Sequence, residues 1–116
     1  MSSKEHRRFP RITASIAVRY EFGSESFTDQ ALNLSLGGLY INADRPLDLG
    51  THITVYFTLP GFDHSFSIGG MVVRKNSEQT PEGPPGMGIE FTRVDKEDER
   101  KLLQFIVQSQ LTQKGF

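Results

Sequence analysis

The sequence predicts a mainly β fold, in which five or six antiparallel strands form a small barrel or sandwich and one helix follows at the C-terminal end. Three observations predict this fold class. Apolar residues recur at every second position in several segments between residues 12 and 92, turn-forming residues separate these segments, and the apolar period lengthens near residue 95. Since 116 residues provide room for one hydrophobic core, we expect a single domain over residues 1–116.

The first strand is predicted over residues 12–22, where the alternation is most regular. Its six core-facing positions are Ile12, Ala14, Ile16, Val18, Tyr20 and Phe22. The next segment, residues 23–26, is rich in turn-forming residues and therefore predicts a hairpin to a second strand. The arginine-rich residues 1–11, which precede the first strand, are expected to form a flexible segment.

The hairpin determines which residues of the two strands face each other. If the numbers of facing residues sum to about 48, Arg11 lies opposite Gly37. Because side chains alternate across a strand, this register assigns the leucines of the second strand to the core and its polar residues to the outer face. The residues concerned are Leu32 and Leu34 on the core side, and Asn33 and Ser35 on the outer side.

Four further segments continue the alternation and are predicted to be strands, around residues 39–41, 53–59, 66–72 and 87–91. Two adjacent glycines, Gly69 and Gly70, predict a bulge or a tight bend in one of them. The segment 76–86 contains three prolines and is predicted to be a loop. Together, the predicted strands place the barrel within residues 12–92.

A helix is predicted over residues 95–112. Asp95 is a good N-cap residue, and Asp98 stands three positions later, as in a weak capping box. The apolar residues that follow recur at helical spacing and should face the barrel, so that the helix packs on the barrel or plugs it. They are Leu102, Leu103, Ile106, Val107 and Leu111.

The composition limits the classes of function. The chain carries no cysteine, so disulfides, zinc–thiolate sites and cysteine nucleophiles are excluded. No apolar run reaches the roughly 18 residues that a membrane-spanning helix needs, and the N-terminus lacks the apolar stretch of a signal peptide. We therefore expect a cytoplasmic protein that does not insert into a membrane.

The charge is distributed unevenly along the chain. The net charge is −1, yet residues 1–20 hold five basic residues against one acidic residue. A local basic patch on a nearly neutral protein favours a small anion over a long polyanion such as DNA or RNA. A barrel that binds RNA or single-stranded DNA would need an extended basic groove with interleaved aromatic residues, whereas the positive charge here is confined to one end.

Two short motifs carry the functional prediction. The first is R-x-x-x-R, formed by Arg7 and Arg11 with Arg8 between them, and the second is N-x-S-x-x-G over residues 33–38. The predicted hairpin brings both motifs to the same end of one β-ribbon. Guanidinium groups beside amide, hydroxyl and backbone N–H donors suit a phosphorylated, purine-bearing ligand. The candidate binding residues are Arg7, Arg8, Arg11, Asn33, Ser35, Gly37 and Gly38.

Each motif also has a simpler interpretation. The arginine cluster could be a solvated basic lead-in, although Phe9 and Pro10 stiffen it. The second motif could be an ordinary turn between two strands, whose exposed N–H groups would still be able to face an anion. No catalytic motif is recognisable, and the histidines share no metal-ligand spacing. We therefore predict neither an enzyme nor a metal or cofactor site.

The two motifs, their order and their separation resemble the PilZ domain, a bacterial receptor module for cyclic di-GMP. The resemblance extends over essentially the whole chain and includes a G-x-G-x-x-F element at residues 86–91. It implies a six-stranded antiparallel β-barrel with a C-terminal helix. It also implies that the arginines bind the guanine edges and phosphates of the ligand, and that Asn33, Ser35 and Gly38 match the fixed positions of the second motif.

For signalling, the resemblance implies ordering of the arginine segment over the ligand and recognition of the changed surface by an unidentified partner protein. Asn33 stands where many members have Asp, and His6 occupies a position linked to ligand stoichiometry. Because the chain has no tryptophan, flat support for the base must come from another side chain, for which Val72 and Arg74 are candidates. The alternative within the same family is an adaptor that binds protein and not the nucleotide.

Overall fold

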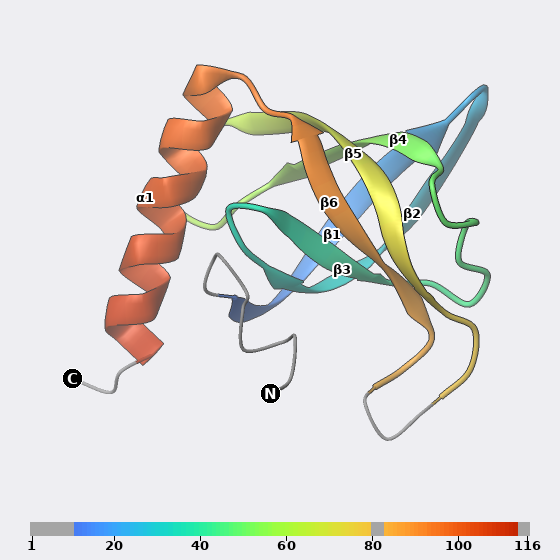
Figure 1. Cartoon of the computed structure of the whole chain (residues 1–116). Helices are drawn as coiled ribbons and strands as arrows, with labels where there is room; N and C mark the ends of the chain where they lie inside the picture. The colour runs from blue at the N-terminus through green and yellow to red at the C-terminus, as the bar shows by residue number, and fades with distance from the viewer. Residues whose placement is uncertain (1–10, 80–82, 114–116) are drawn as a thin grey trace, which may run out of the picture.

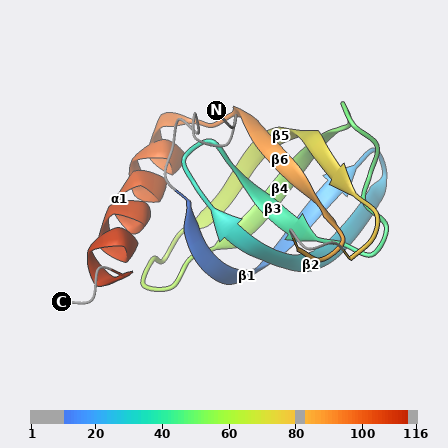
Figure 2. The same cartoon turned by 60° about the horizontal axis from the view of Figure 1, so that its bottom comes forward.

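Within residues 11–79 and 83–113, which the computed structural model describes, six strands close into an antiparallel barrel and one helix packs against its side (Figure 1). The elements are β1 (Ile12–Phe22), β2 (Glu25–Leu34), β3 (Gly38–Asn42), β4 (His52–Thr58), β5 (Ser65–Asn76), β6 (Gly86–Arg93) and α1 (Lys96–Gln113). The strand order around the barrel is β1-β2-β3-β6-β5-β4, and Figure 2 shows the strands curving around it, with α1 to one side. The predicted barrel with a C-terminal helix is confirmed.

The alternating apolar residues of the strands fill the barrel. Four of the six predicted core positions in β1 are buried, namely Ile12, Ile16, Val18 and Tyr20. Ala14 is half-buried, and Phe22 is exposed because it ends the strand at the hairpin. Burial of each large apolar side chain contributes about 1.5–3 kcal/mol to the stability of the fold. The alternation in β1 therefore determines which face of this strand lies inside the barrel.

The β1–β2 hairpin differs from the predicted register. Phe22 faces Glu25, so the turn contains only Gly23 and Ser24, and Gly23 has the left-handed φ of 62° that such a tight turn requires. The predicted pairing, which had Arg11 opposite Gly37, is therefore wrong by one residue near the turn. A register shift between Thr13 and Ile16 moves the pairing by one more residue, so at the start of β1 it differs from the predicted pairing by two residues.

The irregularity also changes which residues of β2 face the core. Leu34 is fully buried, as predicted, but Leu32 is only half-buried and Ala31 takes the core position instead. The reason is a bulge in the β2–β3 ladder. Ala31 and Asn33 of β2, which are two residues apart, pair with Ile41 and Tyr40 of β3, which are adjacent. Leu32 is the extra residue of this bulge, so strict alternation stops there.

Helix α1 begins as predicted, but its rotation about its own axis differs from the prediction. Asp95 Oδ1 accepts the backbone N–H of Asp98 at 2.8 Å, which confirms Asp95 as the N-cap. Leu102 and Ile106 are buried against the barrel. The rest of the predicted barrel-facing stripe is exposed, with exposed fractions of 46% for Leu103, 45% for Val107 and 57% for Leu111.

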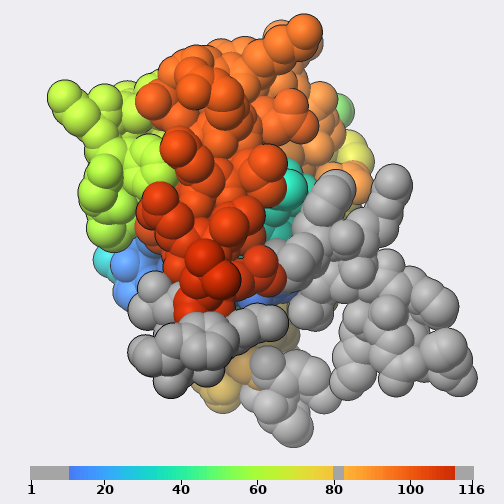
Figure 3. All heavy atoms as spheres, turned by 90° about the vertical axis from the view of Figure 1, so that its left-hand side faces the viewer, coloured from blue at the N-terminus to red at the C-terminus, as the bar shows by residue number. Residues whose placement is uncertain are grey.

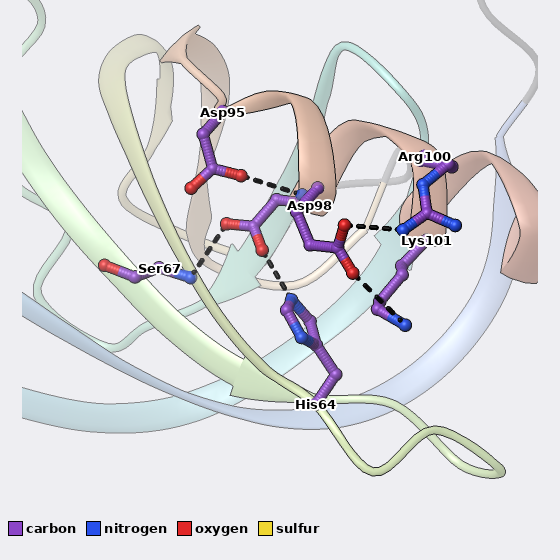
Figure 4. Close-up of polar contacts among 7 residues, drawn as sticks. His64, Ser67, Asp95, Asp98, Arg100 and Lys101 are labelled. Atoms are coloured by element: carbon purple, nitrogen blue, oxygen red, sulfur yellow. Dashed lines mark hydrogen bonds and ion pairs between the residues drawn. The ribbon is translucent and has the colours of Figure 1, made fainter.

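The buried carboxylate of Asp98 explains this rotation (Figure 4). Asp98 Oδ1 lies 2.6 Å from His64 Nε2, and its Oδ2 accepts the Ser67 N–H at 3.3 Å. Residues at i, i+4 and i+8 share one helix face, so holding Asp98 on the barrel also turns Leu102 and Ile106 inward. Figure 3 shows the outward surface of α1 spread across this side of the molecule. Among the described residues, no helix is both long enough and apolar enough to span a membrane.

Candidate ligand-binding site

The two sequence motifs meet at the start of β1. Arg11 directly precedes β1, and its Nη1 donates a hydrogen bond to Asn33 Oδ1 on β2 at 2.9 Å. Thr13 pairs with Asn33 across the hairpin, so the β1–β2 register itself positions this contact. The other two predicted arginines, Arg7 and Arg8, lie outside the described residues. The structure therefore joins one arginine of the first motif to the first residue of the second.

Ser35 is arranged differently from the prediction. Its side chain is buried, with 4% exposed, and its Oγ accepts the backbone N–H groups of Gly37 at 3.1 Å and of Gly38 at 3.2 Å. The Ser35 N–H in turn donates to the Gly38 carbonyl oxygen at 2.9 Å. The expected outward orientation of Ser35 is wrong, because β2 ends at Leu34 and the hydroxyl is needed inside the turn to satisfy backbone groups. The two N–H groups expected to face an anion point at this hydroxyl instead.

Gly38 is required by the close approach of two strands. It pairs with Glu90 of β6, and a Cβ placed on Gly38 would lie 1.9 Å from the Ile89 carbonyl oxygen. No side chain fits at that distance, so β3 and β6 can pair here only with glycine at position 38. The S-x-x-G part of the motif thus shapes the turn between β2 and β3 and the β3–β6 contact that follows it.

Two adjacent pockets open beside this turn on the outer face of the barrel. The first, which we call the Ser35 pocket, has a volume of about 220 Å³, and its lining includes Ser35, Gly38, Gly88 and Glu90. The second, which we call the Asn33 pocket, has a volume of about 380 Å³, and its lining includes Thr13, Asn33, Asn76 and Pro84. Arg11, Tyr40 and Arg74 line both pockets. These three side chains form the boundary that the two pockets share.

Tyr40 is fixed in this boundary by contacts at the hydroxyl end of its side chain. Its Oη donates a hydrogen bond to the Pro84 carbonyl oxygen at 2.8 Å, and Asn76 Nδ2 donates to the same oxygen at 3.0 Å. The ring lies over Gly86, where a Cβ would come within 2.7 Å of it. The glycine that opens the G-x-G-x-x-F element therefore makes room for the Tyr40 ring.

Part of this site was recognisable from the sequence. Arg74, considered there as a support for a base, lines both pockets, whereas Val72 is buried in the core and cannot serve that role. Tyr40 and Glu90 were not predicted. Each stands between two apolar residues of its strand, so alternation alone would have placed both on the outer face.

A second polar cluster lies on the outer face where β1 meets β4. Arg19 Nη1 contacts Glu21 Oε2 at 2.6 Å, and Tyr56 Oη donates to Glu21 Oε1 at 3.0 Å. The hydrogen bond from Arg19 lowers the pKa of Glu21, and the hydrogen bond to Glu21 raises the pKa of Tyr56. Because β1 and β4 pair through only three residue pairs, we assign this cluster to support of that short ladder.

The arrangement around the two pockets suits the binding of a ligand. It combines two guanidinium groups, two amides, an aromatic ring and one carboxylate. Among the described residues, no group of three or more His, Cys, Asp or Glu side chains could hold a metal ion. Planar guanidinium groups bind phosphates and purine edges in bidentate fashion, and aromatic rings stack on bases.

Comparison with known proteins gives a family match over most of the chain. The model of the PilZ domain family matches residues 5–108. No curated protein sequence is significantly similar to the chain. Among solved structures, the MotI/DgrA inhibitor of motility from Bacillus subtilis is 22% identical with a TM-score of 0.77, over 91% of this chain and 52% of that one. The chain thus spans about half the length of that protein.

Two further solved structures resemble the whole barrel. The PilZ domain of YcgR from Escherichia coli, determined with c-di-GMP, is 18% identical with a TM-score of 0.70, over 93% of this chain and 94% of that one. The PilZ domain of CeSA from a cellulose-synthesizing bacterium is 19% identical with a TM-score of 0.65, over 85% of this chain and 96% of that one. At these identities the likeness establishes the fold.

Proposed function

The chain belongs to the PilZ domain family, a family of cyclic di-GMP receptor domains, and from this premise we propose that it is a non-enzymatic cytoplasmic receptor that binds cyclic di-GMP on the outer face of its barrel. The observation that carries the proposal is the 2.9 Å hydrogen bond between Arg11 and Asn33, beside two pockets that Arg11 also lines. It brings the described parts of both motifs together on one surface.

The ligand's chemistry fits these residues. Guanine presents O6 and N7 as an adjacent pair of acceptors, which a guanidinium group can bind in bidentate fashion, and the phosphates accept charge-assisted hydrogen bonds. Arg11 and Arg74 supply two such groups, and the Tyr40 ring offers a flat surface for a base. In this proposal Arg7 and Arg8 complete the phosphate and guanine contacts.

Signal transmission follows from ordering of the arginine segment. Each arginine that is fixed on the ligand loses side-chain freedom worth up to about 2 kcal/mol, which charge-assisted hydrogen bonds to the phosphates offset. Closure of residues 1–11 over the ligand would change the surface near β2 and β3, and a partner protein would read that change.

The experiment that tests the proposal is isothermal titration of the full chain with cyclic di-GMP, with single-stranded RNA as the control ligand. We expect saturable binding of cyclic di-GMP and no binding of the RNA at physiological salt. Binding of RNA alone would assign the barrel to the nucleic-acid class and contradict the proposal.

A family member that binds only protein is the second candidate, and one observation favours a protein partner. The outward face of α1 exposes Leu103, Val107 and Leu111 at a spacing of four residues, which is a surface suited to apolar contact. A full chain that binds neither cyclic di-GMP nor RNA in the titration would support this candidate over the receptor.

A further inference from the structure

The floor of the Ser35 pocket is built from glycines, and a carboxylate stands at its edge. Along the barrel surface, Gly88 of β6 lies between Tyr40 of β3 and Arg74 of β5. Two residues further along β6, Glu90 lies opposite Gly38 of β3. Gly88 has no side chain and leaves this part of the pocket floor open, since a Cβ there would come within 3.2 Å of Arg74 Cβ. Glycine at position 38 instead allows β3 to approach β6 closely. Glu90 therefore borders a hollow that three strands leave unfilled.

Glu90 differs in chemistry from everything else around the two pockets. Among the described residues that line them, it alone carries a carboxylate. Its side chain is exposed, and it forms no ion pair with another residue in the described part of the chain. No ion pair among the described residues therefore accounts for an acidic residue at this position.

The N1–H and N2–H₂ groups of guanine need a hydrogen-bond acceptor, and Asn33 of the second motif is a poor one. The two groups are adjacent donors, which pair best with the two oxygens of one carboxylate. Asn33 offers a single neutral oxygen, and that oxygen already accepts the hydrogen bond from Arg11. Adenine, in contrast, has an acceptor at N1, which a carboxylate would repel.

We infer that Glu90 is the specificity-determining residue of the site, accepting hydrogen bonds from N1–H and N2–H₂ of one guanine of the ligand. The inference rests on the proposed function, since it assigns one residue of the same site. A guanine whose O6 and N7 are bound by an arginine keeps its N1–H and N2–H₂ groups free for a second contact across the pocket. Arg11 and Arg74 line the same pocket and counter the repulsion between the Glu90 carboxylate and the phosphates.

The test compares two cyclic dinucleotides on three forms of the full chain. The parent, Glu90→Gln and the control Glu25→Gln are titrated with cyclic di-GMP and with cyclic di-AMP. Glutamine keeps the length of the side chain but replaces one acceptor by a donor. Glu25 is exposed at the start of β2, beside the turn of the β1–β2 hairpin and outside both pockets, so its variant reports the general effect of removing one negative charge.

The inference predicts that Glu90→Gln weakens cyclic di-GMP binding by about tenfold or more, that cyclic di-AMP binds the same variant more tightly because the repulsion at adenine N1 is gone, and that Glu25→Gln behaves as the parent. Unchanged or tighter binding of cyclic di-GMP to Glu90→Gln would overturn it, because Glu90 would then only repel the phosphates. A parent that binds neither dinucleotide overturns the proposed function itself and is recognised before any variant is compared.

Discussion

Asn33 Oδ1 accepts a hydrogen bond from Arg11 Nη1 at 2.9 Å, although the two residues stand 22 positions apart in the sequence. The contact spans the open end of the β1–β2 hairpin and joins the last arginine of one motif to the first residue of the other. It fixes the position of the guanidinium group relative to both pockets. Removal of either partner should therefore lower the affinity for the ligand more than it lowers the free energy of unfolding.

The first prediction concerns Arg11→Ala. We expect at least about a tenfold loss of cyclic di-GMP affinity, because charge-assisted bidentate contacts are lost, and little change in the free energy of unfolding, because Arg11 is exposed and precedes β1. Isothermal titration and urea denaturation measure the two quantities. Arg45→Ala, at an exposed position after β3 and outside both pockets, is the matched control. An Arg11→Ala variant that binds as tightly as the parent would remove Arg11 from the site.

The second prediction concerns Ser35→Ala. The substitution leaves the N–H groups of the half-buried Gly37 and the buried Gly38 without their acceptor, so we expect a loss of about 1–3 kcal/mol in the free energy of unfolding. Urea denaturation measures the loss, and Ser26→Ala, at an exposed position of β2, should change it by less than about 0.5 kcal/mol. Equal stability of the two variants would mean that Ser35 does not hold the turn.

The strands and the helix could be predicted because their signals are local. Alternation over 11 residues identifies β1, and Asp95 marks the start of α1. The Ser35 orientation could not be predicted in this way, since alternation applies only while the strand continues and β2 ends one residue earlier. The exposure of Leu103 could not be predicted either, because the rotation of α1 depends on the contact between Asp98 and His64, which are far apart in sequence.

The pockets were the least predictable feature. Their shape depends on glycines at positions 38 and 88, whose strands become neighbours only when the barrel closes. Tyr40, Arg74 and Glu90 come from three different strands, and no spacing along the chain links them. The motif arginines and Asn33 were recognisable because a hairpin, the most local of sheet contacts, connects them.

The third prediction concerns the attachment of α1 to the barrel. Asp98→Ala removes the partner of His64 Nε2 and of the Ser67 N–H, so we expect a loss of about 1–3 kcal/mol in the free energy of unfolding. Glu99→Ala, at the exposed neighbouring position, is the control and should change stability by less than about 0.5 kcal/mol. If both variants unfold at the same urea concentration as the parent, the contact does not anchor the helix.

The last prediction concerns Tyr20 and alkaline pH. Burial of the phenol, together with its hydrogen bond to Asp29 Oδ2 at 2.7 Å, raises the pKa of Tyr20 above its ordinary value of about 10. Above that pH the unfolded chain releases the phenolic proton while the folded chain keeps it. The free energy of unfolding should therefore be fully retained below about pH 10 and fall above it, by at most about 1.4 kcal/mol per pH unit from this residue. Urea denaturation between pH 8 and pH 11 should show a steeper fall for the parent than for Tyr20→Phe, which has no proton to release. Equal slopes would show that the phenol releases its proton as readily in the folded barrel as in the unfolded chain.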